Sequence, residues 1–282
     1  MKQTITLILA LIVAGCQGKK EKINDIFFTN SSLESCVKKK ADQDGLTYAD
    51  DLTNLVCKGE GHYSNFEDFN SFPNLTSVIL HSISNTTLSV ENLSFVEDLS
   101  VVSSEHLIAF ELNGTPSLNS LHFQNSNDLS EVHLNQSEAL KSLTIKDAII
   151  RELDIAKVPS LETIIIGTYG VDAFLHDLIR PMAQLDLTPN TNLKEVSIKY
   201  TNLKYLYVEG LDKLEKLTVN ESELEDLFLD NSDLKELTLE SNNISSINLE
   251  YLTQLTHLNL SYNNLKDINL ELNRQLKSAD LN

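Results

Sequence analysis

Residues 234–271 read LKELTLESNNISSINLEYLTQLTHLNLSYNNLKDINLE, and this stretch decides the fold. The pattern LxxLxL recurs in it, and an asparagine follows the pattern twice, at Asn242 and Asn263. Alternate side chains of a strand point to opposite faces. The pattern therefore predicts short strands whose leucines fill an interior, while the residues between the leucines face water.

Units of this kind recur along the chain with a nearly constant period. A first series, the A units, begins at residues 75, 96, 118, 140, 161, 193, 214, 234, 255 and 276. A second series, the B units, begins at residues 85, 107, 129, 150, 182, 203, 224, 244 and 265. Each turn of about 21 residues thus holds two strand-like units, and a turn buries its leucines only when neighbouring turns stack on it. Two parallel sheets, one from each series, are the expected result.

The motif LxxLxLxxNxL around Asn242 and Asn263 resembles the leucine-rich-repeat family. The expected fold class is mainly β: a leucine-rich-repeat solenoid with two short parallel strands per turn, a small helical N-terminal cap and one helical insertion. Both asparagines are expected to turn inward as a structural asparagine ladder that bonds backbone groups of the corner. Ser126, Thr201 and Ser222 stand at the same position in other turns and fill this role less fully.

The first residues have the features of an export signal. Lys2 precedes the apolar run of residues 5–14, which is too short to span a bilayer, so residues 1–15 are interpreted as a signal peptide. The tetrapeptide VAGC at 13–16 resembles the bacterial lipobox, which implies that Cys16 becomes a lipidated N-terminus. An ordinary signal peptide with an accidental cysteine is the alternative.

The residue after Cys16 is Gln17, and by the sorting rule of enterobacterial lipoproteins this suggests the outer membrane. The expected location is therefore the bacterial cell envelope, with a lipid anchor in the outer membrane and the side of that membrane left open. We divide the rest of the chain into a linker over residues 16–30, an N-terminal cap over residues 31–73 and the solenoid over residues 74–282.

The cap is expected to begin with a helix over residues 31–45. A serine would cap its start, and Asp44-Gly45 would stop it. A second, short helix is expected to start at Thr47, with Asp50 three residues on. The arrangement loosely resembles the helical N-terminal caps of internalin-type bacterial repeat proteins. Such a cap is physically needed, because the first turn would otherwise expose its core. The other end, which stops inside an A unit, has no comparable cap and is expected to leave an open sheet edge.

Two cysteines remain after Cys16. In an exported chain, Cys36 in the cap helix and Cys57 in a strand-like segment suggest a disulfide. Closing this loop of 57 − 36 = 21 residues is worth roughly 3 kcal/mol in the chain-entropy model. Two buried thiols are the alternative, and no metal-ligand spacing is present.

One spacing between A units is 32 residues, from 161 to 193, and it marks an insertion over residues 170–181. Apolar residues within it follow the i, i+3, i+4 spacing of an amphipathic helix: Val171, Phe174, Leu175, Leu178, Ile179 and Met182. Pro181 is expected to end this helix. It either packs as a decoration on the side of the solenoid or forms one wall of a binding site.

The net charge of −19, from 22 basic and 41 acidic residues, argues against binding to nucleic acid or to an anionic membrane surface. Acidic residues concentrate at outward positions of the B units: Glu91, Glu111, Glu131, Glu152, Asp154, Asp186, Glu209, Asp226, Asp230, Glu250, Asp267 and Glu271. Outward positions of the A units mix both signs, with Lys146, Lys199 and Lys216 among Glu195, Glu236 and Glu240. The B face is either a solvated surface or a surface for a cation or a basic partner.

Three aromatic residues interrupt the acidic B face just beyond the insertion. Tyr205, Tyr207 and Phe228 are expected to point outward, with Tyr207 and Phe228 in one row on adjacent turns. Exposed clustered aromatics are typical of interaction hot spots, so the predicted partner-binding site joins them to residues of the insertion: Phe174, His176 and Asp177. The alternative is that the insertion helix folds over Tyr205 or Tyr207 and buries them.

The sequence offers no catalytic motif. No Ser–His–acid order is suggested by spacing, and neither a glycine-rich phosphate loop nor HExxH occurs. We therefore expect no enzyme, no catalytic residue, no metal and no cofactor. The expected function is that of a lipid-anchored envelope protein that binds another macromolecule, a protein, through its repeat surface. The alternative is a structural or Ca²⁺-binding envelope protein that uses the acidic B face.

Overall fold

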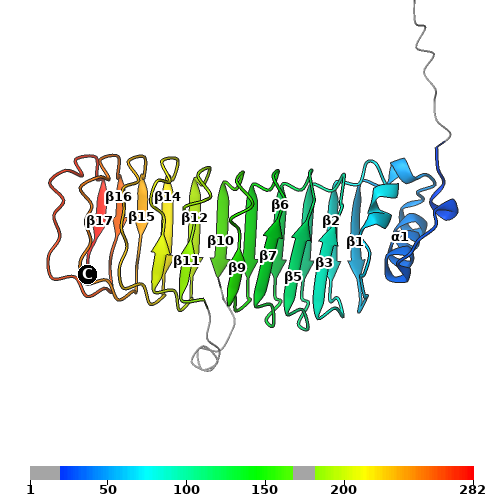
Figure 1. The fold of residues 1–282 in the computed structure, drawn as a ribbon, viewed down its shortest axis with the longest axis horizontal. Coiled ribbons are helices and arrows are strands. Elements are labelled where there is room, and N and C mark those ends of the chain that lie inside the picture. Colours follow the sequence, from blue (N-terminus) through cyan, green and yellow to red (C-terminus); the bar gives the residue numbers. More distant parts are fainter. Residues whose placement is uncertain (1–19, 168–181) are drawn as a thin grey trace, which may run out of the picture.

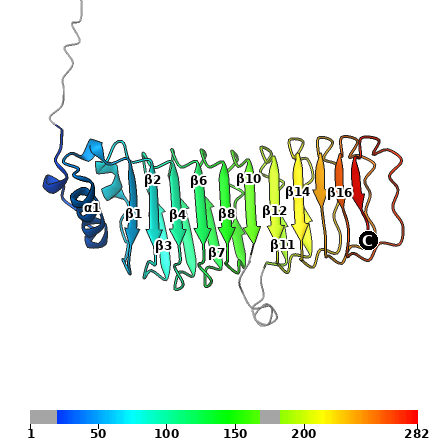
Figure 2. The same cartoon turned by 180° about the vertical axis from the view of Figure 1, so that it is seen from behind.

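The computed structural model describes residues 20–167 and 182–282 and stacks the repeat units into an elongated coil. The helix α1 lies at one end of the coil and the C-terminus at the other (Figures 1 and 2). Strands of successive turns lie side by side along the whole length, so each turn contacts its two neighbours. Within the described residues, no helix is long and apolar enough to cross a membrane.

The A units form one continuous parallel sheet, called sheet A. Each strand pairs in register with the strand of the next turn; for example, Leu217 lies opposite Leu237. Its strands, in spatial order, are β1 (Asn54–Lys58), β2 (Ser77–His81), β4 (Asp98–Val102), β6 (Ser120–Gln124), β8 (Ser142–Lys146), β10 (Thr163–Gly167), β12 (Glu195–Lys199), β14 (Lys216–Asn220), β15 (Glu236–Thr238), β16 (His257–Asn259) and β17 (Ser278–Asp280).

The B units form two separate sheets. One contains β3 (Thr87–Glu91), β5 (Ala109–Asn113), β7 (Glu131–Asn135) and β9 (Glu152–Asp154); the other contains β11 (Gln184–Asp186) and β13 (Tyr205–Tyr207). Beyond β13, a single bridge between Tyr205 and Asp226 continues the pairing. The prediction of two sheets was therefore right for the A units and incomplete for the B units. The break falls at the turn that carries the extra residues.

The interior is apolar, as the alternation predicts. Most strands of both faces alternate buried and outward residues. Most leucines of the LxxLxL pattern are buried along the coil, whereas Leu265, Leu270 and Leu276 at its C-terminal end are only partly buried. Aromatic rings also fill this interior: Phe110 of β5 and Phe123 of β6 meet edge to face with ring centroids 4.8 Å apart. Side chains from the two faces thus interlock in one core.

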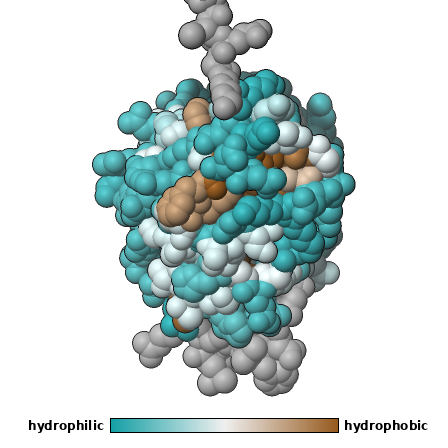
Figure 3. All heavy atoms as spheres, turned by 90° about the vertical axis from the view of Figure 1, so that its right-hand side faces the viewer, coloured by the Kyte–Doolittle hydropathy of each residue, from teal (hydrophilic) through white to brown (hydrophobic). Residues whose placement is uncertain are grey.

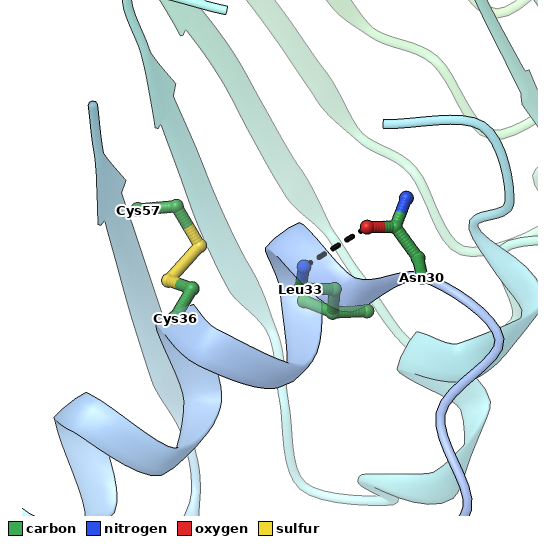
Figure 4. Close-up of a disulfide and its surroundings, with 4 residues drawn as sticks. All are labelled: Asn30, Leu33, Cys36 and Cys57. Carbon is green, nitrogen blue, oxygen red and sulfur yellow. Dashed lines mark hydrogen bonds between the residues drawn. A yellow bond between two sulfur atoms is a disulfide. The ribbon is translucent and has the colours of Figure 1, made fainter. Parts of the chain in front are cut away.

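Helix α1 (Ser31–Asp44) closes the first turn (Figure 4). The predicted serine cap was wrong: Asn30 is the N-cap, because its backbone is extended and its side-chain oxygen accepts the Leu33 N–H at 3.0 Å. Gly45 ends the helix in the left-handed region with φ 70°, as the Asp-Gly pair predicts. The Sγ atoms of Cys36 and Cys57 form a disulfide that joins α1 to β1, so the predicted bridge is present.

Three short 3-10 helices complete the cap region: η1 (Ile23–Asp25), η2 (Ala49–Asp51) and η3 (Glu67–Ser71). The expected helix start at Thr47 with Asp50 was displaced. The acceptor is Asp51, whose carboxylate receives the N–H groups of Thr47 at 3.3 Å and Tyr48 at 2.9 Å, and these bonds lower the pKa of that carboxyl. The first helical residue is then Ala49 rather than an earlier one.

A buried carboxylate fixes the chain where it enters the cap. Asp68 of η3 accepts the N–H of Thr29 at 2.8 Å, the hydroxyl of Thr29 at 2.9 Å and the N–H of Asn30 at 2.9 Å. The end of the cap is mainly hydrophilic with an apolar streak across it (Figure 3). In this region Phe27 is almost fully exposed, whereas Phe28 packs against Phe72 in the core.

Candidate functional site

Lysines and glutamates form a ladder of ion pairs on the outer surface of sheet A between the turns of β10 and β15. Lys194 lies 2.6 Å from Glu162, and Lys235 lies 2.8 Å from Glu215. Lys216 stands between acidic residues of both neighbouring turns, 3.7 Å from Glu195 and 3.5 Å from Glu236. The ammonium group of Lys194 also lowers the pKa of the Glu162 carboxyl, first by its hydrogen bond and then by its charge. The four glutamates Glu162, Glu195, Glu215 and Glu236 are therefore neutralised within the chain.

The B face is charged differently. The twelve acidic residues predicted to point outward are all solvent-accessible. In residues 20–167 and 182–282, none of them forms an ion pair with lysine or arginine, and Glu152 alone approaches a histidine, with 3.9 Å to His133. Their carboxylates therefore remain available to a cationic group from outside the chain.

The predicted aromatic residues are exposed on this face. Tyr205 and Tyr207 of β13 are 42% and 41% exposed, and Phe228 is 54% exposed. Because Tyr205 bridges to Asp226 in parallel register, Tyr207 and Phe228 stand in the same row on neighbouring turns. The Tyr205 hydroxyl donates to Glu225 at 3.4 Å, which fixes its direction along the surface.

A lysine lies at the edge of the aromatic cluster. Lys204 reaches Glu225 at 3.3 Å and Glu223 at 3.7 Å. The hydrogen bond and the charge of Glu225, followed by the charge of Glu223, raise the pKa of Lys204. Lys204, next to Tyr205, is thus already paired with glutamates. Its charge does not neutralise the unpaired acidic residues elsewhere on the B face.

The break in the B face creates a groove of about 430 Å³. It lies between β9 and β11 and is lined by residues of both strands and by the first aromatic residue of the row: Leu153, Asp154, Ile155, Ala156, Gln184, Leu185, Asp186, Pro189 and Tyr207. A volume of this size lies within the range of ordinary ligand sites. The groove therefore adjoins the aromatic cluster and extends it.

Asn242 and Asn263 form a row at the corner between A and B units. The side chain of Asn242 accepts the N–H of Leu224 at 3.1 Å and donates to the carbonyls of Val219, Leu239 and Glu240. Asn263 repeats this pattern one turn later, starting with the N–H of Ile244 at 3.1 Å. Earlier turns place hydroxyls here, for example Thr201 against Ser222 at 2.9 Å.

Sequence reasoning missed a second row of asparagines at the opposite corner, from B to A units. Asn190, Asn231 and Asn273 are buried, and each donates its side-chain N–H groups to two carbonyls of the preceding turn. Each stands three residues before an A unit, where intervening turns have Leu211 and Leu252. Because the asparagine appears in every second turn, the single-turn period does not reveal it.

Some predicted site residues lie outside the described residues. These are Cys16, the predicted lipidation site, and the insertion residues Phe174, His176 and Asp177, together with the predicted helix over 170–181. The alternative that this helix buries Tyr205 or Tyr207 is likewise not tested. In the described part of the chain, no three histidine, cysteine, aspartate or glutamate residues gather in a group that could hold a metal ion.

No family model and no curated protein matches the chain. It is similar in structure to the functional domain of InlJ from Listeria monocytogenes, which includes a cysteine ladder, with TM-score 0.54 and 18% identity over 93% of this chain and 52% of that one. This chain thus spans about half of the InlJ domain.

Two further solved structures are similar at lower scores. Internalin C2 from Listeria monocytogenes has TM-score 0.45 and 18% identity over 92% of this chain and 96% of that one. A leucine-rich-repeat protein from Leptospira interrogans has TM-score 0.37 and 15% identity over 86% and 74%. Together with the two-strand turns, the InlJ match leads to one conclusion: the chain has the leucine-rich-repeat fold of bacterial repeat proteins.

Proposed function

We propose that this protein binds another protein through the B face around Tyr205, Tyr207 and Phe228. The observation that carries the proposal is the exposure of three large aromatic side chains in neighbouring positions, two of them in one row, on an otherwise acidic surface. Aromatic residues supply much of the contact energy of protein interfaces, since they bury large areas at a small cost in side-chain entropy. Unpaired acidic residues around them would favour a partner with a basic surface.

The proposal includes a lipid anchor at Cys16 in the bacterial cell envelope, with the outer membrane as the location. It rests on the apolar run and the VAGC tetrapeptide at 13–16. Cells that produce the protein should incorporate radioactive palmitate into it, and Cys16→Ser should abolish this labelling. Undiminished labelling of the variant would overturn the anchor while leaving the binding proposal intact.

A binding role fits the site better than calcium binding. The carboxylates of the B face are spread along rows, and within the described residues they do not gather into a metal site. Calcium prefers six to eight oxygen ligands around one point. The melting temperature in millimolar Ca²⁺ should therefore match that in magnesium, and a calcium-specific rise of several degrees would favour the alternative.

The binding proposal is tested by a triple substitution. Tyr205→Ser, Tyr207→Ser and Phe228→Ser together remove the aromatic surface without changing the net charge. The control is Tyr251→Ser with Tyr262→Ser, which removes two other exposed aromatic residues, 48% and 72% exposed, at the corners of the coil. Immobilised protein is incubated with envelope proteins from the cells that produce it, and the captured proteins are identified by mass spectrometry.

We expect the triple variant to lose the proteins that the wild type and the control both retain. All three proteins should show the same circular dichroism and melting temperature, because the substituted side chains are exposed. Equal capture by wild type and triple variant would show that the aromatic cluster is not the binding surface.

A further inference from the structure

The groove on the B face lies where strand pairing is interrupted on this face of the coil but not on the other. Sheet A passes the long turn without interruption, and Thr163 of β10 lies opposite Glu195 of β12 in regular register. On the other face, β9 ends one sheet and β11 begins the next. Among the described residues, a backbone bond from the Met182 N–H to the Ile150 carbonyl at 2.9 Å joins the two segments just before these strands. The edges of β9 and β11 then face each other across the groove.

The floor of the groove is apolar and its walls are polar. Ile155 and Leu185 are buried beneath it, and Gln184 lies exposed within it. Asp154 stands on the β9 side, and Asp186 stands on the β11 side. A carboxylate thus flanks the groove on each side, over a surface from which water is readily displaced.

The two carboxylates are held in place by their own turns. Asp186 accepts the N–H of Thr188 at 2.9 Å and its hydroxyl at 2.7 Å, both on one oxygen. Asp154 accepts the N–H of Ala156 at 3.2 Å, also on one oxygen. Within the described residues, neither carboxylate pairs with a lysine, arginine or histidine. Each is therefore oriented but not neutralised.

An aromatic ring completes the groove. Tyr207 lies opposite Asp186 in the β11–β13 register and lines the groove with its half-exposed side chain. A ring next to two carboxylates attracts cations by its π face as well as by the neighbouring charges. The combination of apolar floor, opposed carboxylates and ring matches one chemical group better than others, a guanidinium.

We infer that this groove takes an arginine side chain presented by the partner protein. Asp154 and Asp186 pair with the guanidinium from either side, and Tyr207 packs against its plane. The stem of the arginine lies over the apolar floor, and the partner backbone crosses between the edges of β9 and β11. This inference rests on the proposed function and states the chemistry of the partner at that site.

The test uses defined peptides, so it does not depend on an identified partner. Acetylated tetra-arginine amide is titrated into the protein by calorimetry at about 100 mM salt, where long-range charge effects are screened beyond roughly 10 Å. Tetra-citrulline, which has nearly the same shape without the charge, and tetra-lysine, which has the charge without the planar group, serve as comparison peptides.

The groove variant is Asp154→Asn with Asp186→Asn. Its matched control is Glu250→Gln with Glu271→Gln, which removes the same charge from exposed positions of the same face. We expect the groove variant to weaken tetra-arginine binding at least tenfold and the control to weaken it less than twofold. Tyr207→Leu should weaken tetra-arginine more than tetra-lysine, and tetra-citrulline should not bind measurably.

Three results would overturn the inference: no measurable tetra-arginine binding to the wild type, an unchanged affinity in the groove variant, or equal losses in the groove variant and its control. The last would show a diffuse acidic field without a site. These outcomes differ from a failure of the proposed function. If the aromatic triple variant loses its captured protein while the groove variant keeps both capture and peptide affinity, binding stands and the groove is wrong.

Discussion

Sheet A and the B face are built from the same repeat, but they differ in continuity and in charge. Sheet A has eleven strands in unbroken register and an outer surface of paired lysines and glutamates. The B face is divided into a four-stranded and a two-stranded sheet and has open carboxylates and exposed rings. This division shows that strand pairing can remain continuous on one face of a repeat while it is interrupted on the other. The backbone path and the exposed side chains of the interrupted face can then differ from turn to turn.

The strongest test of this comparison concerns the interior. Leu217 of β14 and Leu206 of β13 belong to the same part of the coil and are both buried, one on each face. We expect Leu217→Ala and Leu206→Ala each to lower the free energy of unfolding by about 2–5 kcal/mol, because each leaves a cavity in the shared core. Urea denaturation followed by circular dichroism measures both. A loss below about 1 kcal/mol for Leu206→Ala alone would break the comparison, since the B face would then be a loose cover over a core held by sheet A.

The disulfide tests how far sheet A transmits a disturbance. Cys36→Ser with Cys57→Ser should lower the stability of the cap by roughly 3 kcal/mol, because the 21-residue loop is no longer closed in the unfolded chain. Since each turn contacts only its neighbours, the effect should remain near β1. Hydrogen exchange should therefore accelerate in α1 (Ser31–Asp44) and stay unchanged in β14. Acceleration in β14 as well would mean that the sheet behaves as one cooperative unit.

The two asparagine rows allow the hydrogen bonding at the two corners of the coil to be compared. Asn242 both accepts a backbone N–H and donates to carbonyls, whereas the side-chain oxygen of buried Asn231 has no partner among the described residues. We expect Asn242→Leu to lower the free energy of unfolding by about 2–3 kcal/mol and Asn231→Leu to lower it by about 1–2 kcal/mol. The difference arises because only Asn242→Leu leaves a buried backbone N–H without an acceptor. Thermal and urea unfolding of both variants measures the difference. The reverse order would show that the oxygen of Asn231 is satisfied.

The smallest effect is expected from the ion pairs of sheet A. Lys194 lowers the pKa of Glu162, so the pair stabilises the protein above the unfolded pKa of this carboxyl, and this contribution disappears as the pH falls through the lower folded value. Lys194→Met should bring the pKa of Glu162 back up toward its ordinary value. Titration by nuclear magnetic resonance measures it, and Lys194→Arg is the control that keeps the lowered value. An unchanged pKa of Glu162 in Lys194→Met would show that this ion pair does not contribute to the stability of sheet A.

Much of the fold follows from the sequence because the repeat fixes both period and face. The spacing of about 21 residues predicts which leucines are buried, and alternation within each unit predicts that Tyr205, Tyr207 and Phe228 point outward. The bridge from Cys36 to Cys57 was predicted from the count of cysteines, on the interpretation that the first residues are an export signal. In each case a local rule and the repeat agree, so the tertiary structure adds little.

Other features depend on contacts between turns that no local pattern contains. The break between β9 and β11 depends on where the chain re-enters the coil after the long turn, and a change in spacing does not determine that path. No sequence pattern singles out Asp68, yet it is buried against Thr29 and Asn30, which lie almost forty residues earlier. For the same reason the N-cap of α1 is Asn30, which this contact holds in place, and not a neighbouring serine.

The alternation at the second corner has a consequence for how neighbouring turns are coupled. Asn231 ties its turn to the one before it through the carbonyls of Val208 and Leu211, but Leu252 makes no such tie to the turn of Asn231, and Asn273 then ties its own turn to that of Leu252. At this corner the side-chain hydrogen bonds of the C-terminal half therefore couple alternate pairs of turns, whereas at the opposite corner Asn263 also couples the turn of Leu252 to that of Asn231. Along this one corner, the structural repeat is therefore twice the sequence repeat.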